Sequence, residues 1–227
     1  MIYKGMLLDI DNTLYDYNIT HKKAKEEIID YCVKKIGLTN SEVDMAYNIA
    51  RKRVHIELIG TASSHNRLIY FQKMLEALDI NPLKYAFDMY NIYWNSFLDN
   101  LKPFNGIYDL LEKYRGKICL ITDLTADVQY QKIKKLKLDY YCNKLVTSEE
   151  AGKEKPHPYI FMLALKKLIC NTYDEVIMIG DNFKKDILGA VDLKMKAIWF
   201  NHKKKEISYN NSLIKEVNKF TDILELI

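Results

Sequence analysis

The sequence predicts an α/β protein in which a parallel β-sheet is flanked by helices and an all-helical segment is inserted near the N-terminus. Two observations lead to this prediction. Beyond about residue 102, short apolar runs that suit buried strands alternate with amphipathic stretches that suit helices. Between about residues 18 and 101, apolar residues recur at helical spacing instead. We therefore expect an α/β domain made of residues 1–16 and 102–227 and a helical domain made of residues 17–101.

The composition is typical of a soluble globular protein, with 48% hydrophobic and 28% charged residues. No apolar run approaches the roughly 18 residues that cross a bilayer. The N-terminus leads directly into the first predicted strand, so we expect no secretory signal, no membrane partner and a cytoplasmic location. The four cysteines are scattered, which favours reduced thiols over disulfides or a zinc site.

The net charge of +4 comes from 34 basic and 30 acidic residues spread along the chain. Arginine, the residue best suited to bidentate phosphate and base contacts, is scarce, and no nucleic-acid motif is present. The sequence thus favours a small-molecule ligand over a nucleic acid polymer. A monomer and a homodimer are both compatible with it.

The first predicted strand, residues 6–8, is followed by Asp9-Ile10-Asp11-Asn12-Thr13. If the extended geometry continues, Asp9 and Asp11 leave the chain on the same side. Two adjacent carboxylates repel each other unless a positive charge lies between them, and a divalent cation would serve. Alternatively, the segment is a polar turn in which Asn12 or Thr13 caps the next helix.

The helical segment contains signals for four helices. A first helix ends at Gly37, Thr39 offers a cap for a second, Ser63 and Ser64 precede a third, and Pro82 opens a fourth. We expect the aromatic residues in these helices to form the core of the segment.

The remaining chain alternates between strands and helices. We expect strands at 117–122, 144–147, 176–180 and 196–200, and helices at 107–114, 126–136, 184–191 and 212–227, with another starting near Pro158. Such alternation implies right-handed crossovers and helices on both faces of a parallel sheet.

Polar residues follow the predicted strands, where open parallel sheets bind their ligands. Thr122 and Asp123 follow one strand, and Asp181 follows another with Asp186 about one helical turn later. Taken alone, Asp181-Asn182 could be a helix cap. With Asp9 and Asp11, however, the acids number four, too many for a cleft without a cation, and oxygen ligands suit Mg²⁺.

Lys155 lies between these acidic segments, in Lys155-Pro156-His157-Pro158. The following proline favours an extended backbone, so the ammonium could neutralise Asp9 and an anionic substrate. Lys155 could also be one solvated lysine among many, and Lys153 is the second choice for the same role.

Together these segments resemble the four motifs of the haloacid dehalogenase-like (HAD) hydrolase superfamily. The residues that carry the resemblance occur in the expected order over nearly the whole chain: Asp9-Ile-Asp11-Asn-Thr13, Thr122 after a strand, Lys155-Pro-His-Pro with Phe161, and Gly180-Asp181-x₄-Asp186. The helical insertion after the first motif is similar to the superfamily's cap domain. The resemblance implies a Rossmann-like α/β core domain.

The resemblance also implies roles for these residues. Asp9 would attack phosphorus and form an aspartyl-phosphate, and Asp11 would act as general acid and base. Thr122 and Lys155, with Asp123 next to them, would bind the phosphoryl group, and Thr122 and Lys155 would also be catalytic. Mg²⁺ would be held by Asp9, the carbonyl group of Asp11, Asp181 and Asp186.

Phosphate chemistry is favoured over dehalogenation because dehalogenases of the superfamily lack the second acid, here Asp11. One departure is Asp123, where many phosphatase relatives carry Asn. The run from Thr147 and the late Trp199-Phe200-Asn201 look similar to nucleoside monophosphatases. A phosphomutase and a non-catalytic binding module on the same fold are the alternatives. Polar cap residues are candidates to contact the substrate: Arg51, Arg53, His55, His65 and Arg67.

Overall fold

The computed structural model describes residues 3–227. The chain forms two compact units, one made of residues up to Asp16 together with Lys102–Ile227, the other of Tyr17–Leu101. Each unit is described by itself below.

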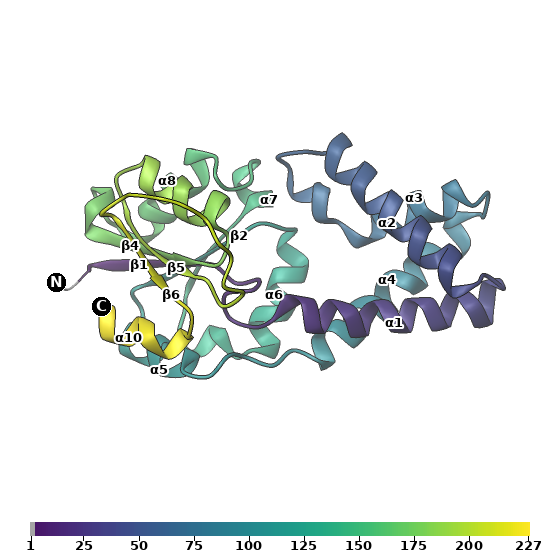
Figure 1. The fold of residues 1–227 in the computed structure, drawn as a ribbon, viewed down its shortest axis with the longest axis horizontal. Coiled ribbons are helices and arrows are strands. Elements are labelled where there is room, and N and C mark those ends of the chain that lie inside the picture. The colour runs from purple at the N-terminus through teal and green to yellow at the C-terminus, as the bar shows by residue number, and fades with distance from the viewer. Residues whose placement is uncertain (1–2) are drawn as a thin grey trace. The chain divides into compact units, whose positions relative to one another are not determined.

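The first unit is built on a six-stranded, fully parallel sheet (Figure 1). The strands lie in the order β3-β2-β1-β4-β5-β6. Their bounds are β1 (Gly5–Leu8), β2 (Ile118–Thr122), β3 (Lys144–Thr147), β4 (Val176–Gly180), β5 (Lys196–Phe200) and β6 (Ile214–Val217). All residues of β1, β2 and β4 are buried, as expected for strands covered on both faces. The predicted Rossmann-like parallel sheet is confirmed.

Helices cover both faces of this sheet. α8 (Pro158–Leu168) packs on β2 and β3. Figure 1 shows α5 (Ile107–Lys113) and α10 (Ile223–Leu226) on the other side. The other helices of the unit are α6 (Ala126–Lys135), α7 (Ser148–Ala151), α9 (Gly189–Asp192) and a π-helix, η4 (Phe183–Leu188). Short 3₁₀ turns lie at Leu138–Tyr140, Tyr173–Glu175 and Phe220–Asp222.

The C-terminal helix predicted over residues 212–227 is wrong. This segment forms β6 and then a 3₁₀ turn and the single-turn helix α10. Ile214 and Val217 satisfy a helical spacing, but β5 offers an unpaired edge and the segment hydrogen-bonds to it. The helix predicted over 184–191 is instead the π-helix η4 followed by α9.

The second unit is all-helical, with α1 (Tyr17–Ile36), α2 (Asn40–Glu57), α3 (Arg67–Ala77) and α4 (Pro82–Asp99). Thr39 caps α2 through a capping box, as its sequence position predicts. Ser63 and Ser64 do not cap α3; they lie in a 3₁₀ turn (Ala62–His65), and the Asn66 side chain is the cap. The core is rich in buried aromatic rings: Tyr47, Tyr70, Phe71, Tyr93 and Phe97.

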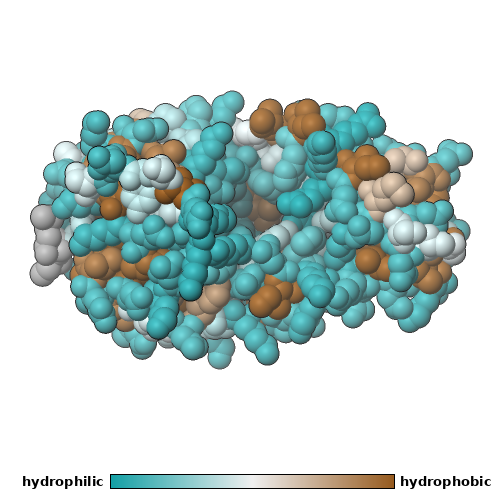
Figure 2. All heavy atoms as spheres, viewed as in Figure 1, coloured by the Kyte–Doolittle hydropathy of each residue, from teal (hydrophilic) through white to brown (hydrophobic). Residues whose placement is uncertain are grey.

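Hydrophilic side chains predominate on the face drawn in Figure 2, and the exposed hydrophobic residues form separate small groups. Among residues 3–227, no helix is long and apolar enough to cross a membrane.

Candidate active site

The topology of the sheet brings three chain segments to one place. β1 lies between β2 and β4, and chain order reverses around it. Open α/β sheets bind ligands at this point, beyond the carboxyl ends of the strands. Asp9 follows β1, Thr122 is the last residue of β2, and Asp181 follows β4. The predicted polar residues therefore meet at the carboxyl edge of the sheet.

Three carboxylates are grouped at this edge. Asp9, Asp181 and Asp186 each present an oxygen, and these atoms all lie within 4.8 Å of one another. Thr13 joins two of the segments, because its hydroxyl donates to Asp9 Oδ2 (2.8 Å) and accepts from the backbone N–H of Asp181 (3.0 Å). Gly180 makes room for the third acid, since a Cβ atom there would lie 2.4 Å from Asp186 Oδ2.

Lys155 provides the positive charge of the cluster. Its ammonium lies 2.6 Å from Asp9 Oδ1 and 2.8 Å from Asp186 Oδ1, and it donates to the Ile121 carbonyl group (3.2 Å). The side chain is only 3% exposed, so it is not a solvated surface lysine. Lys153, the second choice in the sequence, is exposed.

Burial and crowding perturb the acids of this cluster. Burial, reinforced by Asp186 and Asp181, raises the pKa of Asp9 well above its ordinary value, although Lys155 acts in the opposite direction. Burial and the neighbouring Asp186 raise the pKa of Asp181 to about 7, although the positive charges of Lys205, Lys203 and Lys155 act to lower it. A second positive charge would therefore favour the ionised forms.

The cluster has the chemistry of a magnesium site. Its three side chains offer only carboxylate oxygens, which Mg²⁺ prefers, and Lys155 alone leaves three carboxylates facing one ammonium. The residues thus fit a divalent cation. Asp9, Asp181 and Asp186 are the side chains that could hold it.

Asp11 faces a different set of partners. Its carboxylate accepts hydrogen bonds from Lys132 Nζ (2.6 Å), Gln129 Nε2 (2.9 Å) and the Tyr15 hydroxyl. Although burial acts to raise the pKa of Asp11, Lys132 and these hydrogen bonds lower it below its ordinary value. The side chain of Asp11 therefore lies apart from the acid cluster, held in its ionised form.

Gln129 and Lys132 were not predicted from the sequence. Both are fully buried on α6, and Gln129 Nε2 also lies 2.7 Å from Thr122 Oγ1. One α6 face thus links Asp11 to Thr122. Their spacing of three residues places them on one face of a helix, but nothing local distinguishes Lys132 from the neighbouring surface lysines.

Asp123 does not present a free carboxylate. One oxygen accepts the backbone N–H of Lys155 (2.9 Å), and the other lies 3.0 Å from the ammonium of Lys185. The negative charge next to Thr122 is therefore paired within the protein.

Leu124, the next residue, has a φ of +131°, which L-residues rarely adopt, and its side chain is 6% exposed. Such backbone costs about 1–3 kcal/mol and often marks functional sites. Glycine has no such cost, so we expect Leu124→Gly to be more stable than Leu124→Ala by about 1–3 kcal/mol, reversing the usual penalty for glycine. Urea denaturation measures this difference. The same pair of substitutions at Leu120, which lies within β2, is the control and should show the ordinary order.

The cap residues named from the sequence all lie in the helical unit. Arg53 forms a surface ion pair with Glu57 (2.6 Å), and His55 lies 2.5 Å from the Tyr70 hydroxyl. Arg67 is buried, and its guanidinium faces aromatic rings, the nearest being that of Tyr70 at 4.9 Å. Arg51 is exposed, and the rings of His55 and His65 are in contact.

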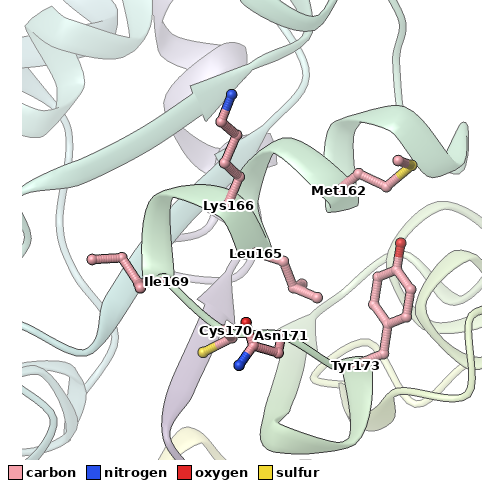
Figure 3. A pocket seen from close by; sticks show the side chains of 7 residues that line it. All are labelled: Met162, Leu165, Lys166, Ile169, Cys170, Asn171 and Tyr173. Carbon is pink, nitrogen blue, oxygen red and sulfur yellow. The ribbon is translucent and has the colours of Figure 1, made fainter.

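A separate pocket of about 470 Å³ lies at the end of α8 (Figure 3). Leu168 of α8 packs against Gly5, the first residue of β1, so this end of the helix lies at the amino edge of the sheet. The pocket is therefore remote from the acid cluster. Its lining residues are Met162, Leu165, Lys166, Ile169, Cys170, Asn171 and Tyr173.

Relatives of known activity share most of the chain. It is 30% identical over 203 residues to a ribulose-1,5-bisphosphate 5-phosphatase of Halopiger xanaduensis, covering 87% of this chain and 84% of the relative. It is 26% identical over 205 residues to the pyrimidine 5'-nucleotidase YjjG of Escherichia coli, covering 88% and 87%.

The fold is that of a solved 2-haloacid dehalogenase from Pseudomonas syringae pv. Tomato, with a TM-score of 0.79, 20% identity and coverage of 100% and 98% of the two chains. The family model for haloacid dehalogenase-like hydrolases matches residues 6–200, which include all the acids described above. The chain therefore belongs to the haloacid dehalogenase-like hydrolase family.

Proposed function

We propose that this protein is a Mg²⁺-dependent phosphatase that hydrolyses a small-molecule phosphate monoester through an aspartyl-phosphate on Asp9. The observation that supports it most is the pairing of Asp9 with a buried Lys155 inside a group of three carboxylates. A carboxylate that attacks an anionic phosphate needs positive charge around it. The phosphatase activities of the relatives named above support the same reaction class.

Each residue has a defined part in the proposed reaction. An oxygen of Asp9 attacks phosphorus while the ester oxygen leaves and takes a proton from Asp11. Water then attacks the phosphorus of the aspartyl-phosphate, Asp11 accepts its proton, and inorganic phosphate and free Asp9 result. Thr122 binds a phosphoryl oxygen, and Lys155 offsets the charge on Asp9 and phosphate.

Asp11 is held ionised by Lys132, which suits the step in which it accepts a proton from water. In the resting protein this carboxylate must gain a proton before it can act as an acid. Bound Mg²⁺, held by Asp9, Asp181 and Asp186, with the Asp11 carbonyl group as a further ligand, would offset negative charge on the phosphoryl group.

The same proposal covers domain roles and substrate. Residues 1–16 and 102–227 would be the catalytic core domain, and residues 17–101 the cap that selects the leaving group. A phosphorylated sugar and a nucleoside monophosphate are the two substrate classes that the relatives support. A cytoplasmic location and a monomeric or dimeric state remain predictions.

A panel of sugar phosphates and nucleoside monophosphates tests the function. We expect phosphate release with Mg²⁺ and a loss of at least about 100-fold when the metal is chelated, because a metal ion supplies several kcal/mol of charge stabilisation. Re-addition of Mg²⁺ to the chelated enzyme is the control. Movement of phosphate within a sugar, without release, would favour the phosphomutase instead. Full activity in the presence of chelator would contradict the proposal.

A further inference from the structure

Three segments of the α/β unit are joined by one partly buried network of charges next to the acid cluster. Lys185, on the π-helix η4, lies 3.0 Å from Asp123 Oδ2 and 3.2 Å from Glu154 Oε2. The Lys185 side chain is 29% exposed, whereas those of Asp123 and Glu154 are only 13% and 8% exposed. The two acids are thus mostly desolvated, and Lys185 is the cation that faces both.

Asp123 connects Lys185 to Lys155. Its second oxygen accepts the backbone N–H of Lys155 at 2.9 Å, and Lys155 in turn places its ammonium 2.6 Å from Asp9. The network therefore runs from η4 through Asp123 to the lysine that faces the nucleophile. Asp123 also directly follows Thr122, the residue whose hydroxyl would bind the phosphoryl group.

Lys185 contributes a positive charge next to two carboxylates. Without its ammonium, the mostly buried carboxylates of Asp123 and Glu154 would lose the ion pairs that link them, and Asp123 directly follows Thr122, which would bind a dianionic phosphoryl group. Removal of a cation from desolvated carboxylates is unfavourable, and like charges repel an incoming anion.

We propose that Lys185 is a positioning residue of this site. Its ammonium neutralises Asp123, so that Asp123 can hold the backbone of Lys155 in place without repelling the bound phosphoryl group. This inference rests on the proposed phosphatase function. It assigns a role to a lysine that does not contact the reacting atoms, and it gives a physical reason why Asp123 is compatible with phosphate binding here.

The test compares wild type with Lys185→Met, Lys185→Arg and the double variant Asp123→Asn/Lys185→Met. We expect Lys185→Met to weaken binding of inorganic phosphate, measured by calorimetry with Mg²⁺ present, by about 10-fold, which corresponds to a typical coupling between interacting charges. The KM for a phosphate ester should rise by a similar factor, with a smaller change in kcat. Lys185→Arg should retain most of the affinity. The double variant should recover part of the loss, because the charge of Asp123 next to Thr122 is then absent while Glu154 keeps its own.

Lys184→Met is the matched control, because Lys184 is an exposed neighbour on η4. Phosphate affinity within twofold of wild type in Lys185→Met would overturn the proposal, and so would a double variant as impaired as Lys185→Met. Urea denaturation of the same set gives the coupling in stability. If Asp123 and Lys185 are coupled in stability but not in phosphate binding, their ion pair is purely structural, and the proposal is also overturned. If wild type releases no phosphate from any ester, the proposed function fails, a result distinct from failure of Lys185 alone.

Discussion

Asp9→Asn is expected to lower kcat by about 10⁴-fold or more, as removal of a nucleophile does in other enzymes that form a covalent intermediate. An amide oxygen is a poor nucleophile and cannot form the aspartyl-phosphate. Folding should survive the change, because the substitution removes one of three crowded acids and Lys155 keeps its contact with Asp186. Phosphate release under single-turnover and steady-state conditions measures the loss.

Asp109→Asn is the matched control for this variant. Asp109 is an exposed residue in the first turn of α5, and its substitution should leave turnover unchanged. Thermal unfolding of both variants separates loss of chemistry from loss of structure. Turnover by Asp9→Asn at more than about one hundredth of the wild-type rate would assign the nucleophile to another residue.

The contribution of Asp181 to the stability of the metal-free protein is expected to fall as the pH rises from 5 to 8. Asp181 has a pKa of about 7 in the folded state, because of burial and the nearby Asp186, against an ordinary value of 3.8. Between these values the folded state binds one more proton than the unfolded state, so the free energy of unfolding falls with pH. At about 1.4 kcal/mol per pH unit, the part of this interval between pH 5 and pH 7 amounts to about 3 kcal/mol.

Two neighbouring acids also change the free energy of unfolding with pH. Asp9, whose pKa is also raised, acts in the same direction. Asp11, whose pKa is lowered, acts in the opposite direction, but only below about pH 4. Burial also lowers the pKa of His21 to about 3 and that of His202 below its ordinary value of 6.5, so these histidines act in the opposite direction up to about pH 6.5. The difference between wild type and Asp181→Asn therefore isolates the contribution of the acid cluster.

Mg²⁺ should reverse the trend, because it binds the ionised carboxylates and stabilises the folded state most at pH 8. Urea denaturation at several pH values, with and without Mg²⁺, measures both effects. Asp181→Asn should flatten the metal-free profile and reduce the response to Mg²⁺. An Asp181→Asn variant with the same metal-free pH profile as wild type would contradict the interpretation of this cluster.

The sequence allowed the parallel sheet and the four long helices to be predicted because their signals are local. Buried strands such as β2 and β4 are continuous apolar runs, and Thr39 and Pro82 mark helix starts by their own chemistry. The C-terminal segment was predicted wrongly because Ile214 and Val217 suit a helix and a strand equally. Only the position of β5, fixed by the rest of the fold, decides between them.

Asp9, Asp181 and Lys155 could be named from the sequence because each lies at a strand end or beside a turn-forming proline, and Asp186 follows Asp181 by about one helical turn. Lys132 and Lys185 could not be identified among 34 basic residues, because their partners Asp11 and Asp123 are distant in sequence. The sequence could not show where the Asp123 carboxylate points either, because its partners Lys155 and Lys185 are also distant in sequence. Contacts between remote segments, and not residue type, distinguish these two lysines.

The central place of β1 also bears on the order in which the protein acquires structure during synthesis. β1 precedes the other five strands of its sheet in the sequence and pairs with β2 and β4, so that Met6 has its neighbours at Ile118 and Ile177. β1 therefore cannot pair with both neighbours until the chain has been made beyond β4 (Val176–Gly180), while α1 to α4 can contact one another much earlier. Because pairing of such distant segments is slow, assembly of the sheet is expected to be the late step in the life of each new chain.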